Sequence, residues 1–183
     1  NMHELYPFWR TFFNELGFRV VLSDRTTKQL IHRGIEKIIS ETCFPVKVAH
    51  GHVQNLLDKG VKKIFIPSVI DARVEGQWEG RGYYCPYVQT IPYVIKAAFN
   101  FKEYGAELLT SYFYMGREWS RMEDQLIELA DRLGKGQTEA IKAARAARDA
   151  QDEFSEKCRK RGMEVLERLP QDRIAMVIVS RPY

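Results

Sequence analysis

The sequence predicts an α/β protein with a small parallel sheet covered by helices. Segments with apolar residues at helical spacing alternate with short apolar runs that are typical of strands. The order strand, helix, helix, strand over residues 18–66 leaves a crossover that is long enough to join parallel neighbours. The last apolar run, Arg173 to Val179, is nearly continuous, which is typical of a strand buried on both faces.

The first part of the chain contains three expected helices and two expected strands. Large apolar residues recur at helical spacing before Gly17, a residue that favours a helix end. Pro45 suits the first turn of a helix. The expected elements are a helix over 5–16, a strand over 18–22, a helix from Thr26 or Thr27 to about Ser40, a helix from Pro45 to Gly60 and a strand over 63–66.

The second part begins with a stretch that shows no periodicity. Pro67 to Gly82 contains three glycines and is interpreted as a long loop, a kind of segment that is often functional. Beyond it, we expect a helix from about Pro86 to Phe99, a strand or extended segment over 108–115, an amphipathic helix over 118–133, a long helical segment within 135–170 and the last strand over 173–179. The fold prediction is therefore a Rossmann-like sheet with a long C-terminal helix before the last strand.

Composition narrows the class of protein. The apolar fraction is 45%, which argues against disorder over the whole chain, and the net charge of +4 does not indicate a nucleic-acid partner. No stretch approaches the roughly 20 apolar residues of a membrane span, and the N-terminus does not resemble a signal peptide. An odd count of three cysteines favours a cytoplasmic protein with reduced thiols. We expect one α/β domain over 1–183, cut from a longer protein, because a buried strand should feed a further element.

Two cysteines occur in the same local context. Cys43 and Cys85 each stand just before a proline-containing helix start, in Cys-Phe-Pro and Cys-Pro. A helix N-terminus lowers the pKa of a thiol and offers N–H groups that can bond cluster sulfides. Two such thiolates could be iron–sulfur ligands, although small half-buried apolar residues are the simpler interpretation. Cys158 lies on the apolar stripe of the long helix, where packing is the favoured role.

Three polar residues follow Cys43 on the expected helix. His50 and His52 are two positions apart and should point in roughly opposite directions, so they would not chelate one metal ion unless Gly51 breaks the helix. One of them could face Cys43 as a hydrogen-bond donor or proton carrier; the alternative is one surface and one core histidine. Lys47 could hold a thiolate or an anionic ligand, or it could be solvated.

Several familiar motifs are absent from the sequence. There is no G-x-x-x-x-G-K-[ST] loop, no G-x-G-x-x-G and no G-x-S-x-G. The chain by itself is therefore not expected to hydrolyse ATP or to bind a dinucleotide in the usual way.

The distinctive segments together resemble one known family. They are Pro7-Phe8-Trp9, Glu41 to Lys47, Ala49 to Val53, Ile64 to Pro67, Cys85 to Gln89 and Arg181-Pro182-Tyr183. They are similar to the domain of unassigned function in acyl-CoA dehydratase activase-related proteins, also described as CoA-substrate-specific enzyme activases. This domain is related to the iron–sulfur subunits of 2-hydroxyacyl-CoA dehydratases.

The resemblance implies a role in electron transfer. Cys43 and Cys85 would match two of three cysteine ligands of a [4Fe-4S] cluster, and the third would lie beyond Tyr183. Lys47, His50 and His52 would lie around these ligands. An isolated fragment would hold an incomplete site, could lack the cluster and would not be catalytic alone. The implied partners are an ATPase activator domain or subunit and an acyl-CoA dehydratase-type enzyme, with neither nucleic acid nor membrane involved.

Three functions remain open at this point. The first is an iron–sulfur electron-transfer module of an ATP-driven system. The second is a reductase or dehydratase subunit that works at the cluster. The third is a non-catalytic scaffold that docks an ATPase activator to its target enzyme.

Overall fold

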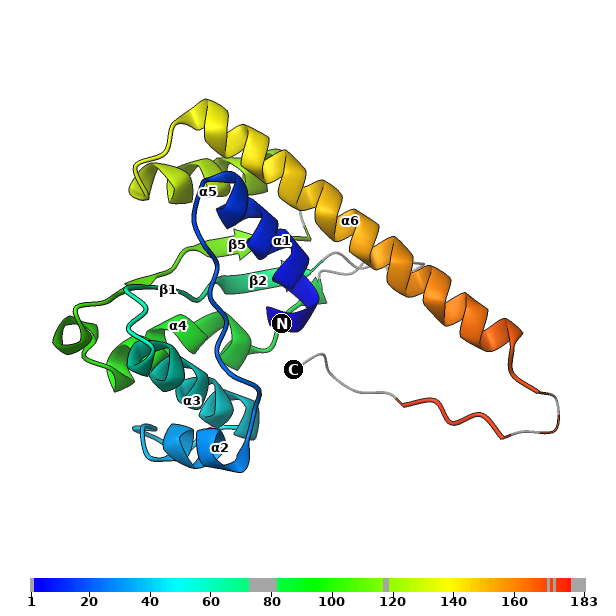
Figure 1. Ribbon diagram of the computed structural model, residues 1–183, viewed down its shortest axis with the longest axis horizontal. Coiled ribbons are helices and arrows are strands. Elements are labelled where there is room, and N and C mark those ends of the chain that lie inside the picture. Colours follow the sequence, from blue (N-terminus) through cyan, green and yellow to red (C-terminus); the bar gives the residue numbers. More distant parts are fainter. Residues whose placement is uncertain (1, 73–81, 117–118, 171, 173, 179–183) are drawn as a thin grey trace. The chain divides into compact units, whose positions relative to one another are not determined.

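The computed structural model describes residues 2–72, 82–116, 119–170, 172 and 174–178 (Figure 1). The chain divides into two compact units, Val21–Leu129 and Asn1–Val20 with Ala130–Tyr183. The first unit holds the strands and the candidate site. The second holds the first helix and the long helix.

The sheet is built on one interrupted parallel ladder. β1 pairs with β4 and β2 pairs with β5, and the register of the first pair continues through Val69 before it shifts between Val69 and Asp71. The Ile66 N–H donates to the Leu109 carbonyl at 3.0 Å, and the Ser68 N–H donates to the Ser111 carbonyl at 2.9 Å. Pro67 lies between these two bonds, and because alternate N–H groups of a parallel strand face one neighbour, its missing N–H costs no bond of this pairing. The strands are β1 (Lys63–Phe65), β2 (Ser68–Ala72), β4 (Glu107–Leu109) and β5 (Tyr112–Tyr114).

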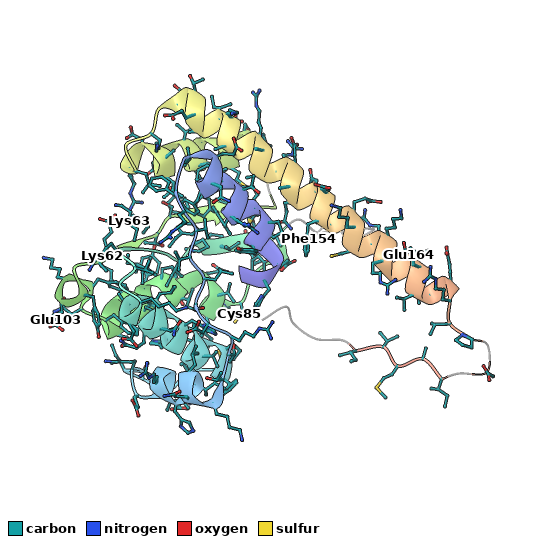
Figure 2. The ribbon with its side chains drawn as sticks, in the orientation of Figure 1. Lys62, Lys63, Cys85, Glu103, Phe154 and Glu164 are labelled. Carbon is teal, nitrogen blue, oxygen red and sulfur yellow. The ribbon has the colours of Figure 1, made fainter. Side chains whose placement is uncertain are left out.

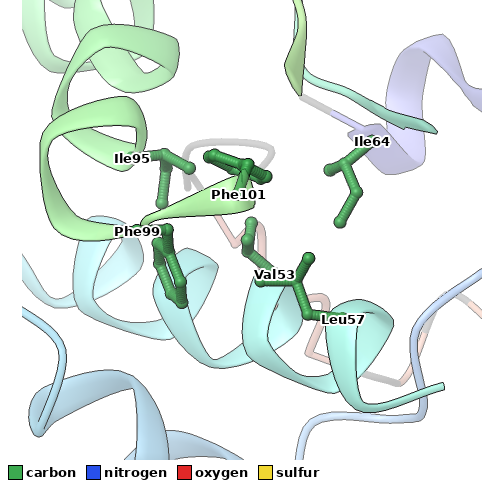
Figure 3. Close-up of a cluster of buried hydrophobic side chains, with 6 residues drawn as sticks. All are labelled: Val53, Leu57, Ile64, Ile95, Phe99 and Phe101. Carbon is green, nitrogen blue, oxygen red and sulfur yellow. The ribbon is translucent and has the colours of Figure 1, made fainter. Parts of the chain in front are cut away.

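Two helices and a short 3-10 turn share a core with β1. Helix α3 (Phe44–Asp58) leads into β1, and α4 (Pro86–Ala98) leads through η1 (Phe101–Tyr104) into β4. Their inward side chains form one buried cluster (Figure 3), and burying each large apolar side chain contributes about 1.5–3 kcal/mol. The cluster consists of Val53, Leu57, Ile64, Ile95, Phe99 and Phe101.

Helix α2 (Lys28–Ile35) packs closely on α3. Thr27 is its N-cap, and the Thr27 hydroxyl accepts a hydrogen bond from the Leu30 N–H at 3.2 Å, as the sequence predicted. The helix ends at Ile35, earlier than expected, and the side chain of Ile39 beyond it is exposed. The apolar residues beyond Ile35 keep helical spacing in the sequence, but they do not extend the helix.

Helix α5 (Trp119–Arg132) follows β5. Its Gln125 side-chain oxygen accepts a hydrogen bond from the Tyr114 N–H at 3.3 Å. The Asp71 carboxylate at the end of β2 accepts one from the Gly116 N–H at 2.9 Å. These two bonds hold Tyr114 to α5 and Gly116 to the end of β2.

The second unit contains an antiparallel helix pair. In α1 (Met2–Glu15) and α6 (Gln137–Glu167), the Gln151 amide donates to the Glu4 carbonyl at 3.0 Å, and Lys142 lies 3.5 Å from Glu15. Four buried alanines on α6 let the helices approach closely: Ala140, Ala143, Ala144 and Ala147. Within the described residues, no helix has the length and apolarity needed to cross a bilayer.

Two strand predictions at the ends of the chain are wrong. Phe18 to Leu22 is irregular, and the Leu22 carbonyl accepts a hydrogen bond from the Lys59 ammonium at 3.3 Å, not from a neighbouring strand. Residues 174–178 also form no strand, and Ile174 is fully exposed. Strand formation depends on a pairing partner as well as on β propensity, and this segment has none among the described residues. Residues 173 and 179 lie outside them.

The loop predicted from Pro67 to Gly82 is also corrected in part. Its first residues form β2, and β3 (Gly82–Tyr83) pairs antiparallel with the end of β2. Residues 73–81 lie outside the described part of the chain. The segment over 108–115, which the sequence left open, contains most of β4 and all of β5.

Candidate functional site

Cys43 lies at the start of α3, as the sequence predicted. It is the N-cap residue, and its carbonyl accepts hydrogen bonds from the Val46 and Lys47 N–H groups at 3.1 and 3.2 Å. Its side chain makes no capping hydrogen bond and is exposed. Pro45 lies in the first turn, where a missing N–H costs no helical bond.

Cys85 occupies the equivalent position in α4. It is the N-cap residue, Pro86 follows it, and its carbonyl accepts from the Val88 and Gln89 N–H groups at 2.8 and 3.1 Å. Its side chain also makes no capping hydrogen bond, but it is partly buried. Figure 2 shows Cys85 at the beginning of the helix.

The topology brings both helix starts to the same edge of the sheet. Helix α3 passes through a short turn into β1, so its N-terminus points toward the carboxyl ends of the strands (Figure 1). Helix α4 begins directly after β3, which is paired with the end of β2. The carboxyl edge is where open α/β sheets place ligands.

Neither helix has an acidic residue in its first turn. The first turn of a helix carries a partial positive charge and favours a negative group. In both α3 and α4 the N-cap residue is a cysteine. The electrostatics of both helix starts therefore suit an anionic sulfur ligand.

Lys47 lies in the first turn of α3. Its side chain is 18% exposed and forms an ion pair with the carboxylate of Glu41, which is 83% exposed. Glu41 and Lys47 thus flank Cys43 on either side. A cation alone is unfavourable near a helix N-terminus, so the Glu41 carboxylate stabilises Lys47 at this position.

His50 faces the interior of the first unit. It is fully buried, its Nδ1 donates to the Val46 carbonyl at 2.7 Å, and its ring centroid lies 6.0 Å from that of Phe99. Its Nε2 is buried and has no hydrogen-bond partner among the described residues. Burial lowers the pKa of His50 below its usual value, and the hydrogen bond to Val46 opposes that shift. The structure therefore gives His50 a core position.

His52 points in another direction, as the two-residue spacing predicted. Its Nδ1 lies 2.7 Å from the Ser23 hydroxyl and its Nε2 lies 3.1 Å from the Thr26 hydroxyl. In the same loop, Asp24 accepts a hydrogen bond from Lys59 at 2.7 Å. His52 therefore holds the loop before α2 against α3.

Cys158 lies far along α6 and is exposed. The packing role expected from the sequence is wrong, because this part of α6 has no buried residues among those described. The apolar stripe that contains Cys158 is buried only in the first half of the helix.

Ser68 and Gln89 were not singled out by the sequence interpretation, although both lie next to Cys85. The Gln89 side chain donates to the Tyr84 carbonyl at 2.7 Å, and the Ser68 hydroxyl donates to the Gln89 carbonyl at 2.5 Å. Ser68 was hidden because a serine in a segment without periodicity indicates a loop. Gln89, in contrast, stood in a recognised segment without an assigned role.

No group of three or more His, Cys, Asp or Glu side chains in the described part of the chain is arranged to hold a metal ion. Of the three free thiols in the chain, the two at helix starts are those of Cys43 and Cys85. Fold and site together define an α/β protein that presents two helix-capping cysteines at the carboxyl edge of its sheet.

Comparison with known families supplies the identity of the chain. Residues 1–183 match the family described as CoA enzyme activase uncharacterised domain (DUF2229), and the chain belongs to that family. Neither a search of curated proteins nor a search of solved structures found a match. The family resemblance expected from the sequence is confirmed.

Proposed function

We propose that this chain is the iron–sulfur electron-transfer module of an ATP-driven, CoA enzyme activase-type system. In this proposal Cys43 and Cys85 are two of three cysteine ligands of a [4Fe-4S] cluster, and the third ligand comes from outside the chain. When bound, the cluster would accept and pass on single electrons. The partners would be an ATPase activator and an acyl-CoA dehydratase-type enzyme.

The observation that carries the proposal is the equivalence of the two cysteines. Both are N-cap residues, both lack a side-chain capping bond, and neither helix has an acid in its first turn. Capping residues are usually Ser, Thr, Asp or Asn, because their oxygens accept a hydrogen bond from the first turn. The cysteine side chains at both positions make no such hydrogen bond. Two helix starts built in this unusual way at one sheet edge favour sulfur ligation over packing.

The donor set fits the proposed cluster. Thiolates are the usual ligands of [4Fe-4S] clusters, and helix N–H groups near the sulfurs tune the reduction potential. Lys47 follows Cys43 by four residues on the same helix, and its ammonium is paired with the Glu41 carboxylate. In this proposal the described residues supply two ligands, Cys43 and Cys85, and no third ligand is grouped with them. The third cysteine must therefore come from outside the chain.

The test is anaerobic reconstitution, with iron and sulfide, of the longer polypeptide expected from the sequence. Cys43→Ala and Cys85→Ala should each lower bound iron and the broad visible absorption. Cys158→Ala is the matched control and should retain both, since Cys158 lies on another unit. Wild-type iron content in both the Cys43 and Cys85 variants would exclude the proposal.

One observation favours a second candidate, a docking scaffold. The second half of α6 exposes several large apolar side chains, including Met163 at 53% and Leu166 at 61%. Figure 2 shows Phe154 and Glu164 on this part of the helix. A scaffold would bind and activate its partner with both cysteines replaced, whereas Leu166→Glu would weaken that binding. Partner activation by the two sets of variants separates the candidates.

A further inference from the structure

We propose that Gln89, supported by Ser68, is a positioning residue that fixes the Cys85 thiol as a ligand. This inference rests on the proposed function, because it assigns Cys85 the role of a cluster ligand. It goes further by naming the groups that hold the ligand in place. It also predicts that the two cysteines differ in rigidity.

The Gln89 side chain supplies the restraint that a cysteine cap lacks. A cap oxygen would bond the first turn and fix the angle at which the chain enters the helix. At the start of α4 the Gln89 side-chain amide instead reaches back and donates to the Tyr84 carbonyl at 2.7 Å. The Gln89 main-chain N–H donates to the Cys85 carbonyl at 3.1 Å. Gln89 therefore bonds the peptide groups on both sides of the Cys85 Cα. The Cys85 sulfur makes no capping hydrogen bond.

The same turn is tied to the sheet on two sides. The Ser68 hydroxyl in β2 donates to the Gln89 carbonyl at 2.5 Å, and Ser68 is only 2% exposed. The Tyr84 N–H donates to the Ile70 carbonyl, also in β2, at 3.0 Å. A buried hydrogen bond to a strand is costly to break because its partner is left unsatisfied. The start of α4 is therefore held to β2 both before and after Cys85.

Among the described residues, no side-chain hydrogen bond from a strand holds the helix start at Cys43 in a comparable way. The nearest side-chain interaction in the sequence is the ion pair of Lys47 with Glu41, and Glu41 is 83% exposed. Ion pairs with one partner in solvent contribute little to stability. Cys43 is also exposed, whereas Cys85 is partly buried. We therefore assign Cys85 as the fixed ligand and Cys43 as the more adaptable one.

Such support matters for a metal ligand. Groups around the ligands orient them, and their loss typically lowers metal affinity or activity by about 10–100-fold. The variants Gln89→Ala, Gln89→Glu and Ser68→Ala each remove one donor of this bridge, and Gln89→Glu preserves the size of the side chain. Thr90→Ala is the matched control, because the Thr90 hydroxyl donates only within its own helix, to the Pro86 carbonyl at 2.7 Å.

The first measurement needs no cluster. The 183-residue chain is alkylated with iodoacetamide under native conditions, and the rates at Cys85 and Cys43 are compared by peptide mass spectrometry. Loss of one hydrogen bond of about 1 kcal/mol corresponds to roughly a fivefold change in the open population. The Gln89 and Ser68 variants should therefore raise the ratio of the Cys85 rate to the Cys43 rate about fivefold. Thr90→Ala should leave that ratio unchanged.

The second measurement uses the reconstituted longer polypeptide. The Gln89 and Ser68 variants should shift the electron paramagnetic resonance spectrum and the midpoint potential of the cluster, and Thr90→Ala should shift neither. If the cluster forms but neither the alkylation ratio nor these signals change in Gln89→Glu, the positioning role is wrong. If the wild type binds no cluster while the ratio still rises, the turn is fixed as described and the proposed function fails instead.

Discussion

Gly34 of α2 and Gly51 of α3 lie against each other where the two helices cross. A β-carbon added to Gly34 would be 2.7 Å from the Gly51 nitrogen and closer still to the Lys47 carbonyl oxygen. A β-carbon added to Gly51 would collide with the Leu30 carbonyl oxygen. The obstacles are backbone atoms, which cannot rotate away. The two glycines therefore set how closely α2 can pack on the helix that carries Cys43.

The first prediction concerns this crossing. Gly34→Ala and Gly51→Ala should each lower the free energy of unfolding by about 1–3 kcal/mol, the range for overpacked interiors, because the helices must separate. Chemical denaturation followed by far-ultraviolet circular dichroism measures the change.

Gly162→Ala is the matched control for these two substitutions. It lies in the interior of helix α6, and nothing lies within 4 Å of its added β-carbon. Alanine there should stabilise the protein by roughly 0.5–1 kcal/mol, since glycine weakens helix interiors. Equal effects at all three positions would contradict the close packing of α2 on α3.

The second prediction concerns the buried His50. The Val46 carbonyl can only accept, so the neutral ring carries its proton on Nδ1, and a second proton on Nε2 would be buried without an acceptor. Burial lowers the pKa of His50 in the folded state. The unfolded chain binds this proton near pH 6.5 and the folded chain only at lower pH. Stability should therefore fall as the pH drops below about 6.5.

The expected loss at His50 is up to about 2 kcal/mol between pH 7 and pH 5, the linkage limit for one such group. His50→Phe should remove this part of the pH dependence, because the phenyl ring fills similar space and cannot be protonated. Urea unfolding over this pH range measures it, and the exposed His32→Gln controls for loss of a histidine. An unchanged slope in His50→Phe would mean that His50 titrates alike in both states.

The third prediction distinguishes the two faces of α4. Ile95 is fully buried in the cluster of Figure 3, and Tyr93 is 58% exposed. Ile95→Ala should cost about 2–5 kcal/mol, because it leaves a cavity in a packed core. Tyr93→Ala should change the free energy of unfolding by no more than about 0.5 kcal/mol. Thermal or chemical unfolding of both variants tests the assignment, which fails if Tyr93→Ala proves the more damaging.

Helix starts were predictable from the sequence because their signals are local. Thr27, Pro45 and Pro86 each mark a first turn through capping or a fixed backbone angle. The positions of Cys43 and Cys85 followed from those signals alone. Predicting these helix starts requires no knowledge of long-range contacts, so the candidate ligands can be located from the sequence.

Strands and supporting groups were harder to predict, since their structure depends on distant partners. Ser68 and Asp71 interrupt the apolar pattern of β2, and both are buried with hydrogen bonds to distant main-chain groups. A single sequence does not reveal such partners, so β2 was interpreted as loop. The opposite error occurred at 174–178, where strong β propensity has no partner among the described residues.

The last prediction concerns the two halves of α6. Ala144 is fully buried and belongs to the alanine stripe of the first half, whereas Leu166 in the second half is 61% exposed. Ala144→Leu should cost about 1–3 kcal/mol, because the added atoms overpack a close helix contact. Leu166→Glu should stay within about 0.5 kcal/mol, since its side chain already lies in solvent. Denaturation of the 183-residue chain measures both, and a large loss in Leu166→Glu would show that the second half of α6 is packed within this chain.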